Sequence, residues 1–582
     1  MTKPQGKHFM NASATIVQDS LQGLCYARPH LKLLADKRVV YAANVDQVAK
    51  AQVTLISGGG SGHEGAFAGF VGDGLLTAAV CGGVFASPSA SQVLAALERV
   101  QSPNGVLVVV MNYTGDCLHF GLAVERAKAK GIRAKLLVVK DDLASRNTRV
   151  GSRGMAATAM VIKICGAMAA QGASLDELVH VGQEIMNHSA TLGVALDHCH
   201  VPGSSSHVTL APGEMELGMG IHNEAGIQKL PWMPAKNLVD LMVDRLLCPE
   251  TSNLVAPEDK VTKVVLMVNN YGGTPLLEFN VIIKEAVEAI HRIPRLQLER
   301  VLPGCFVTSL NMPGFSLSLL TIPDDKDAWL DDLDSPVQVS GWPRLPSFGS
   351  MAILGTQPTF CLTPLMASQD QASVSGTHDV LEKVLRTILT QLKAIEPTVT
   401  SYDTVLGDGD LGASLLQAAD AIEKNMAKIT QKANVSDALL SLADIIDHHV
   451  GGTASAIYCI YLNALANALA EQPEQSAVTS WMDACASALT TLEKYTQARV
   501  GDRTMMDTLI PFVTTWQKTK SFENAVTAAQ QGMFATIKQK PALGRTAYLS
   551  EDTVLKANMP DAGAFALSSI LDAIHSSLGL DE

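Results

Sequence analysis

Three aspartates lie within eight residues in the last third of the sequence, in the stretch DTVLGDGDLG at residues 403–412. Carboxylates this close repel one another unless a cation lies between them. Hard divalent metals prefer such oxygen ligands, and Mg²⁺ completes its octahedron with phosphate oxygens. The alternative is an exposed acidic turn, because Asp-Gly pairs are common in turns. An EF-hand is excluded, because the twelfth position counted from Asp403 is Ser414 and not Glu.

A glycine-rich stretch, GGGSGHE at residues 58–64, directly follows the β-branched run Val53–Ile56. Consecutive glycines allow backbone N–H groups to approach a ligand oxygen closely. The stretch is not a Walker A loop, because His63 and Glu64 stand where Lys and Ser or Thr are required. It predicts either a ligand-binding loop or only a tight connection after a strand.

Two other loops carry polar side chains. In NYTGD, residues 112–116, Asp116 could accept a hydrogen bond from a substrate hydroxyl, orient His63, or simply cap the next helix. In GMGIHNEAG, residues 218–226, His222 stands among small residues. A lone histidine is more often structural than functional.

Strands and amphipathic helices alternate over the first 340 residues and predict an α/β fold, in which ligands bind beyond the carboxyl ends of the strands. The polar loops described above occupy such positions. The expected strands are Val53–Ile56, Val106–Met111, Leu136–Val139 and Val264–Val268, and two of the expected helices are Gln92–Val100 and Leu118–Lys130.

The alternating pattern stops at residues 341–375, which are rich in Pro, Gly and Ser and predict a linker or, alternatively, a long ordered loop. The linker would separate a domain at residues 1–340 from one at residues 376–582. In the second domain apolar residues recur at helical spacing, and the first helix is expected to end at Pro397. Residues 439–446 and 567–578 show the same spacing, so this domain is predicted to be all-helical.

The net charge of −13 argues against a general affinity for nucleic acid or anionic membrane. The first twenty residues contain no apolar secretory segment, and the apolar run Ser455–Ala470 is interrupted by Asn463 and Asn467. The ten cysteines include no C-x-x-C pair, which favours a reducing compartment. We therefore expect a cytoplasmic protein without a membrane span.

These motifs, in this order and together with GDRTMMD at residues 501–507, resemble the dihydroxyacetone kinase family. The resemblance extends over nearly the whole chain and is to the single-chain, ATP-dependent form, most of all the animal triokinase/FMN cyclases. It implies a substrate domain of two α/β subdomains, followed by a nucleotide domain built as a barrel of eight helices.

For the first domain, the resemblance implies that His222 adds an imidazole nitrogen to the ketone carbon and forms a covalent hemiaminal. Only a carbonyl can form this bond, so glycerol would be rejected. His63 and Asp116 would hydrogen-bond the substrate hydroxyls and assist deprotonation of the attacking oxygen. The other implied pocket residues are Gly60, Ser61, Gly62 and Met111, the last standing where animal relatives tend to carry Lys.

For the second domain, the resemblance implies that Asp403, Asp408 and Asp410 hold two Mg²⁺ ions that bridge the phosphates of ATP. Arg503 could pair with Asp502 or Asp507, or steady a phosphate. The residues implied in nucleotide binding are Asp410, Leu411, Gly412, Ala413, Thr453, Ala454, Thr496, Thr504, Met505, Asp561, Ala562 and Gly563. Two of these positions depart from the family pattern, since Thr453-Ala454 replaces Ser-Ser and Ala562 replaces a proline.

The expected reaction is ATP-dependent phosphorylation of dihydroxyacetone and glyceraldehyde by a homodimer. A second expected activity splits FAD into AMP and cyclic FMN with Mn²⁺ or Co²⁺. Two alternatives are a non-catalytic sensor of triose or nucleotide that regulates a partner protein, and a phosphotransferase whose donor is a phosphoprotein.

Overall fold

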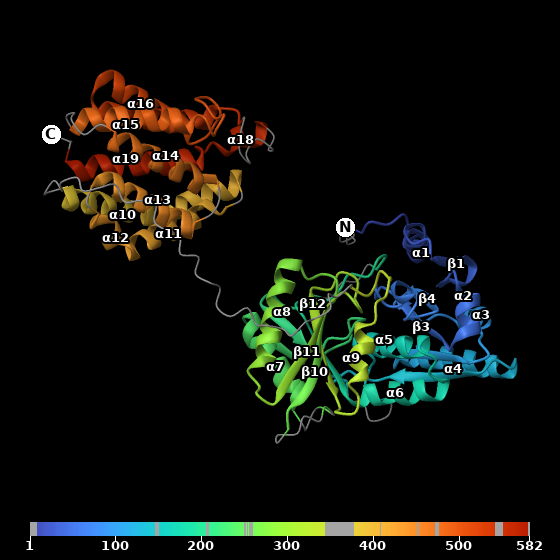
Figure 1. The fold of residues 1–582 in the computed structure, drawn as a ribbon. Coiled ribbons are helices and arrows are strands. Elements are labelled where there is room, and N and C mark those ends of the chain that lie inside the picture. Colours follow the sequence, from blue (N-terminus) through green and yellow to red (C-terminus); the bar gives the residue numbers. More distant parts are fainter. Residues whose placement is uncertain are drawn as a thin grey trace. The chain divides into compact units, whose positions relative to one another are not determined.

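The chain folds into two compact units, Met1–Gln357 and Pro358–Glu582, each of which is described by itself (Figure 1). The computed structural model describes residues 8–145, 151–204, 209–248, 252, 254, 260–343, 377–407, 409–432, 434–450, 453–471, 477–541 and 551–579. Of the predicted linker at residues 341–375, only residues 341–343 are among these.

The first unit contains two six-stranded sheets, and its first sheet has the order β1-β2-β4-β3-β5-β6. Strands β4, β3, β5 and β6 are parallel, as expected for strand–helix alternation. The strands are β1 Leu31–Leu34, β2 Val39–Ala42, β3 Thr54–Ser61, β4 Ala78–Val84, β5 Val106–Met111 and β6 Ala134–Val139. The accompanying helices are α1 Ile16–Ala27, α2 Val45–Ala51, α3 Ala90–Val100, α4 Thr114–Ala129 and α6 Leu175–Asn187.

The second sheet has the order β11-β10-β12-β7-β8-β9. It is mixed: β10 and β11 are parallel, whereas the remaining neighbours are antiparallel. The strands are β7 Ser189–Ala195, β8 Glu214–Leu217, β9 Gln228–Pro231, β10 Thr262–Asn270, β11 Leu296–Gly304 and β12 Gly314–Ile322. Helices α7 Ala235–Leu247 and α8 Leu276–His291 belong to this half of the unit (Figure 1).

Helix α5, Ala157–Ala170, joins the two halves of the first unit. It is apolar on nearly all sides, which is typical of a helix buried in a core. It packs against β3 and β5 of the first sheet and against β7 and β12 of the second. The single charged side chain on α5, Lys163, is fully buried and donates to the main-chain carbonyl of Asp332 on α9, Ala328–Asp334.

Strand β3 extends further than the sequence predicts, through the glycine run to Ser61 rather than ending at Ile56. The reason is close approach of neighbouring backbone. A Cβ atom at Gly58 would lie 2.2 Å from the Val80 carbonyl oxygen, and one at Gly60 would lie 2.8 Å from the backbone nitrogen of Ala86. Only glycine permits this packing, and it places His63 just beyond the carboxyl end of β3.

The second unit is all-helical over its described residues. Eight helices have 14 residues or more, and they form a closed ring in which each packs against the next along the chain and α19 returns to α10. The long helices are α10 Thr377–Leu406, α11 Leu411–Lys424, α13 Val435–His449, α14 Thr453–Ala470, α15 Ala477–Leu492, α16 Met506–Thr519, α17 Phe522–Ala535 and α19 Ala562–Leu578. The short helices are α12 Met426–Thr430 and α18 Glu551–Ala557.

The prediction that Pro397 ends the first helix of this unit is wrong, because α10 continues to Leu406 with Pro397 inside it. A proline within a helix removes one hydrogen bond and costs about 3 kcal/mol. The turns beyond it bury Val399 and Leu406, so the apolar face of α10 continues past the proline. Tertiary burial therefore outweighs the local penalty.

The ring of helices encloses an apolar cavity of about 920 Å³. One helix among the described residues, α14, is long and apolar enough to cross a membrane by length and composition alone. A single helix of this kind is a weak indication, because core helices of water-soluble proteins pass the same test. Ile457, Tyr461 and Leu465 of α14 line the interior cavity.

Candidate active site

Two imidazoles from distant parts of the sequence face each other in the first unit. The Nε2 atoms of His63 and His222 are 3.1 Å apart, although 159 positions separate the residues along the chain. Nδ1 of His63 donates to the carbonyl oxygen of Thr308 at 2.8 Å, and its ring stacks on Phe85. Burial, followed by the nearby His222, lowers the pKa of His63 to about 3.

The loop between β8 and β9 presents His222 and is itself tightly held. The Ser309 hydroxyl donates to the carbonyl oxygen of Ile221 at 2.6 Å. Asn223, at φ 66°, exchanges two hydrogen bonds with the backbone of Cys199. These contacts fix the chain on both sides of His222.

Glu224 is the direct partner of His222. One carboxylate oxygen accepts from Nδ1 of His222 at 3.0 Å, and the other accepts from the His222 backbone N–H at 2.9 Å. Burial alone would raise the pKa of Glu224, but hydrogen bonds from His222 and the charges of His222 and Arg153 lower it to about 2. Glu224 is therefore an anion at neutral pH.

Arg153 links Glu224 to a second carboxylate. Its Nε donates to Asp142 at 2.6 Å, its Nη2 donates to the Gly218 carbonyl oxygen at 2.9 Å, and its Nη1 lies 3.9 Å from Glu224. The positive guanidinium of Arg153 therefore lies between two negative carboxylates, those of Asp142 and Glu224.

Asp116 lies in the first turn of α4, beyond the carboxyl end of β5. It is not the N-cap, which is Tyr113, so the capping alternative is wrong. It is buried, and its Oδ1 has no hydrogen-bond partner among the described residues. Burial raises its pKa, while a hydrogen bond from Ser87 lowers it. His63 is oriented by Thr308 rather than by Asp116.

The other predicted pocket residues lie close to these groups. Ser61 donates to the Gly82 carbonyl oxygen at 3.0 Å, and Gly62, at φ 108°, donates its N–H to Glu64 at 3.1 Å. A Cβ atom at Gly60 or Gly62 would collide with Phe85 or the residue after it. Met111 is buried at the end of β5.

Several residues of the site were not identified from the sequence. Tyr113 and Phe85 contact His222 edge to face, with ring centroids 4.7 and 5.1 Å apart. Glu224 stands in the quoted motif two residues after His222, so an acidic neighbour was a usable signal. Thr308 and Arg153 carry no such local signal, because folding alone brings them to the histidines.

In the second unit, most residues predicted to bind the nucleotide lie at the same end of the ring of helices. Consecutive helices that are neighbours in a bundle and joined by short turns run antiparallel, so alternate helices begin at the same end. Helices α11, α14, α16 and α19 are such alternates. All but one of the predicted residues lie at or just before their first turns: Asp410, Leu411, Gly412, Ala413, Thr453, Ala454, Thr504, Met505, Asp561, Ala562 and Gly563. Thr496 lies instead in the segment between α15 and α16.

Specific contacts support this gathering. Leu411, Ala454 and Met505 line the same interior cavity. A Cβ atom at Gly563 would lie 3.6 Å from the Cβ of Met505, which places the start of α19 against the start of α16. The Cβ of an alanine at position 412 would lie 2.0 Å from the Thr400 hydroxyl, so Gly412 allows α11 to approach α10.

The acidic turn lies between α10 and α11. Asp403 accepts from the backbone N–H of Leu411 at 3.0 Å, and Gly409 adopts φ 79°. Asp408 lies outside the described residues. Within the described ranges, no three His, Cys, Asp or Glu side chains are close enough to hold a metal ion. Asp403 and Asp410, with Asp408 between them in sequence, have the carboxylate chemistry that Mg²⁺ prefers.

Arg503 is buried, and it pairs with neither Asp502 nor Asp507 by a direct hydrogen bond. Its Nη2 donates to the Met559 carbonyl oxygen at 2.7 Å, and its Nη1 lies 4.0 Å from Asp561. Burial raises the pKa of Asp561 to about 6, although a hydrogen bond from Ala564 and the positive charge of Arg503 both act to lower it. The charge of Asp403 contributes to this rise, so the acidic turn lies near the start of α19.

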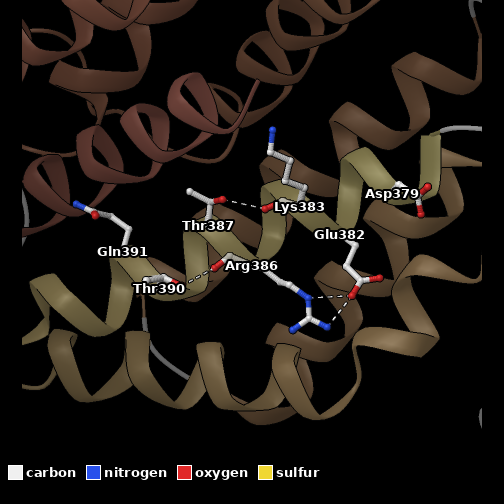
Figure 2. A pocket seen from close by; sticks show the side chains of 7 residues that line it. All are labelled: Asp379, Glu382, Lys383, Arg386, Thr387, Thr390 and Gln391. Carbon is white, nitrogen blue, oxygen red and sulfur yellow. Dashed lines mark hydrogen bonds and ion pairs between the residues drawn. The ribbon is translucent and has the colours of Figure 1, made fainter. Parts of the chain in front are cut away.

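A separate open hollow of about 570 Å³ lies on the outer face of α10 (Figure 2). Its side chains interact among themselves, as in the ion pair between Arg386 and Glu382 at 2.6 Å. Thr387 and Thr390 hydrogen-bond the preceding turn of the same helix. None of the predicted site residues lines it, so we interpret it as a solvated helix face.

Comparison with known proteins bears on both units. The Dak1 domain profile matches residues 22–340, and the DAK2 domain profile matches residues 405–576. Dihydroxyacetone kinase 2 of Saccharomyces cerevisiae is 36% identical over 98% of this chain and 99% of its own. Triokinase/FMN cyclase of Homo sapiens is 34% identical, with 98% of each chain covered. The dihydroxyacetone kinase of C. freundii, solved in complex with AMP-PNP and Mg²⁺, superposes with a TM-score of 0.64 at 30% identity, covering 98% of this chain and 99% of its own.

An α/β Dak1 domain followed by a helical DAK2 domain is the architecture of a two-domain kinase on a single chain. The chain belongs to the dihydroxyacetone kinase family, which includes the triokinase/FMN cyclases.

Proposed function

We propose that this enzyme transfers the terminal phosphate of ATP to dihydroxyacetone and glyceraldehyde, and that it holds the triose as a hemiaminal on His222. The observation that carries the proposal is the pairing of His222 with His63 near Asp116. Asp116 has a buried carboxylate oxygen that finds no hydrogen-bond partner in the part of the chain that the structure describes, and such an oxygen is costly unless a donor reaches it. A substrate hydroxyl is a donor of the required kind.

In the proposed first step, Nε2 of His222 adds to the carbonyl carbon while the carbonyl oxygen takes a proton from the histidine pair. The triose then remains attached through a bond that an alcohol cannot form, so glycerol is excluded. Asp116 accepts from the hydroxyl that is to be phosphorylated and favours its loss of a proton.

In the proposed second step, this hydroxyl oxygen attacks the terminal phosphorus of ATP in line, the bond from that phosphorus to ADP breaks, and Asp116 takes the hydroxyl proton. Asp403, Asp408 and Asp410 would hold two Mg²⁺ ions, which neutralise phosphate charge when bound. The first turns of α11, α14, α16 and α19 would offer backbone N–H groups to the nucleotide. Positioning and charge neutralisation account for most of the rate in phosphoryl transfer generally.

Incubation of the purified protein with labelled ATP, Mg²⁺ and dihydroxyacetone, without any other protein, tests the reaction. We expect dihydroxyacetone phosphate as the product. No labelled product under these conditions would favour a non-catalytic sensor, and a product seen only with a phosphoprotein donor would favour the other alternative.

Two variants test which residues act in triose capture and which act in phosphoryl transfer. His222→Ala should lose ketone selectivity over glycerol, and unchanged selectivity would contradict the hemiaminal. Asp408→Ala should lose phosphorylation while the first unit still captures the triose; a fully active variant would contradict the metal assignment.

A second activity is favoured by the triokinase/FMN cyclase relatives. We propose that the helical unit also splits FAD into AMP and cyclic FMN with Mn²⁺ or Co²⁺, with a ribityl hydroxyl of FAD as the attacking group. Cyclic FMN should form from FAD and Mn²⁺ in His222→Ala as in the wild type, because this reaction needs no triose site. Absence of cyclic FMN with either metal would exclude the activity.

The family resemblance also leads us to propose a homodimer in which the helical domain of one chain covers the substrate domain of the other. Light scattering of the purified protein should give twice the chain mass of 61.7 kDa. A monomer that retains full kinase activity would contradict this arrangement.

A further inference from the structure

The partners of the two histidines determine where their protons lie. Nδ1 of His63 contacts a main-chain carbonyl oxygen, and Nδ1 of His222 contacts the Glu224 carboxylate. Both oxygens can only accept hydrogen bonds. Each Nδ1 must therefore carry a hydrogen, which leaves Nε2 of each ring as the variable position.

The two Nε2 atoms face each other at 3.1 Å. Two neutral rings with hydrogens on Nδ1 would present two lone pairs to each other at this distance, which is repulsive. One proton between them turns the contact into an N–H···N hydrogen bond and gives the pair one positive charge. The ionised Glu224 is in contact with His222, one of the two rings that share this charge.

We infer that His63 and His222 share a single proton between their Nε2 atoms, and that Glu224, anchored by Arg153, is the positioning residue that keeps this proton and the reactive tautomer of His222 in place. The inference rests on the proposed role of His222 as the atom that captures the carbonyl. It adds a source for the proton that the capture requires.

The atoms and charges of the capture step then balance without any other reactant. The lone pair of His222 Nε2 forms the C–N bond, the carbonyl π electrons move to oxygen, and the shared proton passes through His63 to that oxygen. Before the step the positive charge belongs to the histidine pair. After it the charge lies on the alkylated imidazolium of His222, which still donates Nδ1–H to Glu224.

The backbone is shaped around the charges that support this pair. A Cβ atom at Gly220 would lie 2.0 Å from the Glu224 carboxylate and 2.3 Å from the Arg153 guanidinium. Any side chain at this position would therefore displace one of the two groups. Asp142 binds the far side of Arg153 at 2.6 Å, so the guanidinium cannot swing away from Glu224 without breaking an ion pair that is nearly buried.

The titratable groups facing the pair set its pH dependence. Glu224 and Asp116 favour the protonated pair, while Arg153 opposes it, and Tyr113, whose pKa burial raises, stays neutral. The low pKa of His63 keeps a second proton off the pair until well below neutral pH. Capture should therefore be lost on the alkaline side, as the shared proton leaves.

Capture can be measured by NMR with dihydroxyacetone labelled with ¹³C at the carbonyl carbon. The signal of capture is a protein-bound tetrahedral carbon, and this signal should be missing in His222→Ala. Removing the negative charge in Glu224→Gln should weaken capture about ten- to hundredfold, because the hydrogen bond from His222 then goes to a neutral acceptor and no longer to a charged one. The pH above which capture is lost should also fall by about one unit or more in this variant. Arg153→Met should weaken capture, and Arg153→Lys should restore part of it.

Glu216→Gln is the matched control. Glu216 is a buried carboxylate in β8, next to the start of the same loop, and it accepts from the Gly226 N–H at 2.6 Å. The variant removes a charge beside the loop while leaving the His222 partner in place, and it should keep both the strength of capture and its pH profile.

Wild-type capture and pH profile in Glu224→Gln would overturn the inference, and so would a weakening that is equal at every pH. Failure of the wild type to form a bound tetrahedral carbon would overturn the proposed hemiaminal instead. Neutron diffraction of the ligand-free protein separates the two, because it should show one deuterium between the Nε2 atoms and one on each Nδ1. Two facing Nε2 atoms without a deuterium between them would overturn the shared proton whatever the outcome of the capture experiment.

Discussion

At the scale of single residues, Asp116 combines a chemical role with a cost in stability. Its carboxylate is buried beside His63 and His222, and burial raises its pKa. A carboxyl group whose pKa is higher in the folded than in the unfolded state destabilises the fold when it is ionised. The folded protein therefore loses stability as the pH rises through the unfolded and then the folded pKa of Asp116.

Asp116→Asn should separate these two effects. The variant keeps an oxygen that can accept from Ser87 but cannot take up a proton, so we expect phosphorylation to fall by about 10²–10⁴-fold. Thermal unfolding at pH 7 should occur at the same or a higher temperature than in the wild type, because a buried charge has been removed. Lost activity together with a lower melting temperature would indicate a structural role instead.

At the scale of secondary-structure elements, α10 shows that a helix can continue through a proline when its later turns are buried. Pro397 itself is exposed, while Val399 beyond it is fully buried. The proline thus costs a hydrogen bond without contributing to the core.

Pro397→Ala should therefore stabilise the helical unit by about 1–3 kcal/mol, since it restores one backbone hydrogen bond and removes a steric clash. Urea unfolding of the full chain, followed at the transition of the second unit, measures the change. A loss of stability would mean that the proline contributes a bend that the ring of helices requires.

Helix α5, which lies between the two sheets of the first unit, contains a buried charged residue that lowers stability, Lys163. Burial lowers the pKa of Lys163 to about 8, although Asp332 and Asp334 act in the opposite direction. A lysine whose pKa is lower in the folded state is penalised while it is charged. Stability should then be constant below pH 8 and should rise between pH 8 and the unfolded pKa of about 10.5.

Lys163→Met should abolish this rise, because the methionine fills a similar volume without a charge. Thermal scans of the first unit at pH 7–10 test it, with the exposed Lys128→Met on α4 as the control. A rise that persists in Lys163→Met would assign it to another group.

At the scale of the whole molecule, the chain consists of two compact units, each with its own core. Ligands that bind one folded unit should stabilise that unit alone. We expect the triose to stabilise the first unit, and the Mg²⁺–nucleotide complex to stabilise the second.

A non-hydrolysable ATP analogue with Mg²⁺, at about 100 times its Kd, should stabilise the second unit by about 2.7 kcal/mol. Asp403→Asn or chelation of Mg²⁺ should remove most of this shift, while the shift that dihydroxyacetone causes in the first unit should remain. Asp420→Asn, an exposed aspartate on α11, is the matched control. A full nucleotide shift in Asp403→Asn would contradict the proposed metal site. Differential scanning calorimetry resolves the two transitions.

The sequence by itself determined the local features. Apolar runs and helical periodicity predicted β5, β10, α13 and α19, because these elements bury a continuous apolar surface that local patterning encodes. The spacing of glycines, histidines and aspartates indicated the candidate triose and nucleotide sites, because backbone approach and charge repulsion depend on near neighbours.

Only the tertiary structure decided features that depend on residues far apart in the chain. Strand β3 includes its glycines because β4 packs against them, and α10 passes through Pro397 because the ring buries its later turns. Thr308 holds His63 from 245 positions away, and the second nitrogen of that ring meets His222. Hydrogen bonds between distant segments leave no periodic pattern in the sequence, so the proton arrangement of the two histidines could be inferred only once the chain was folded.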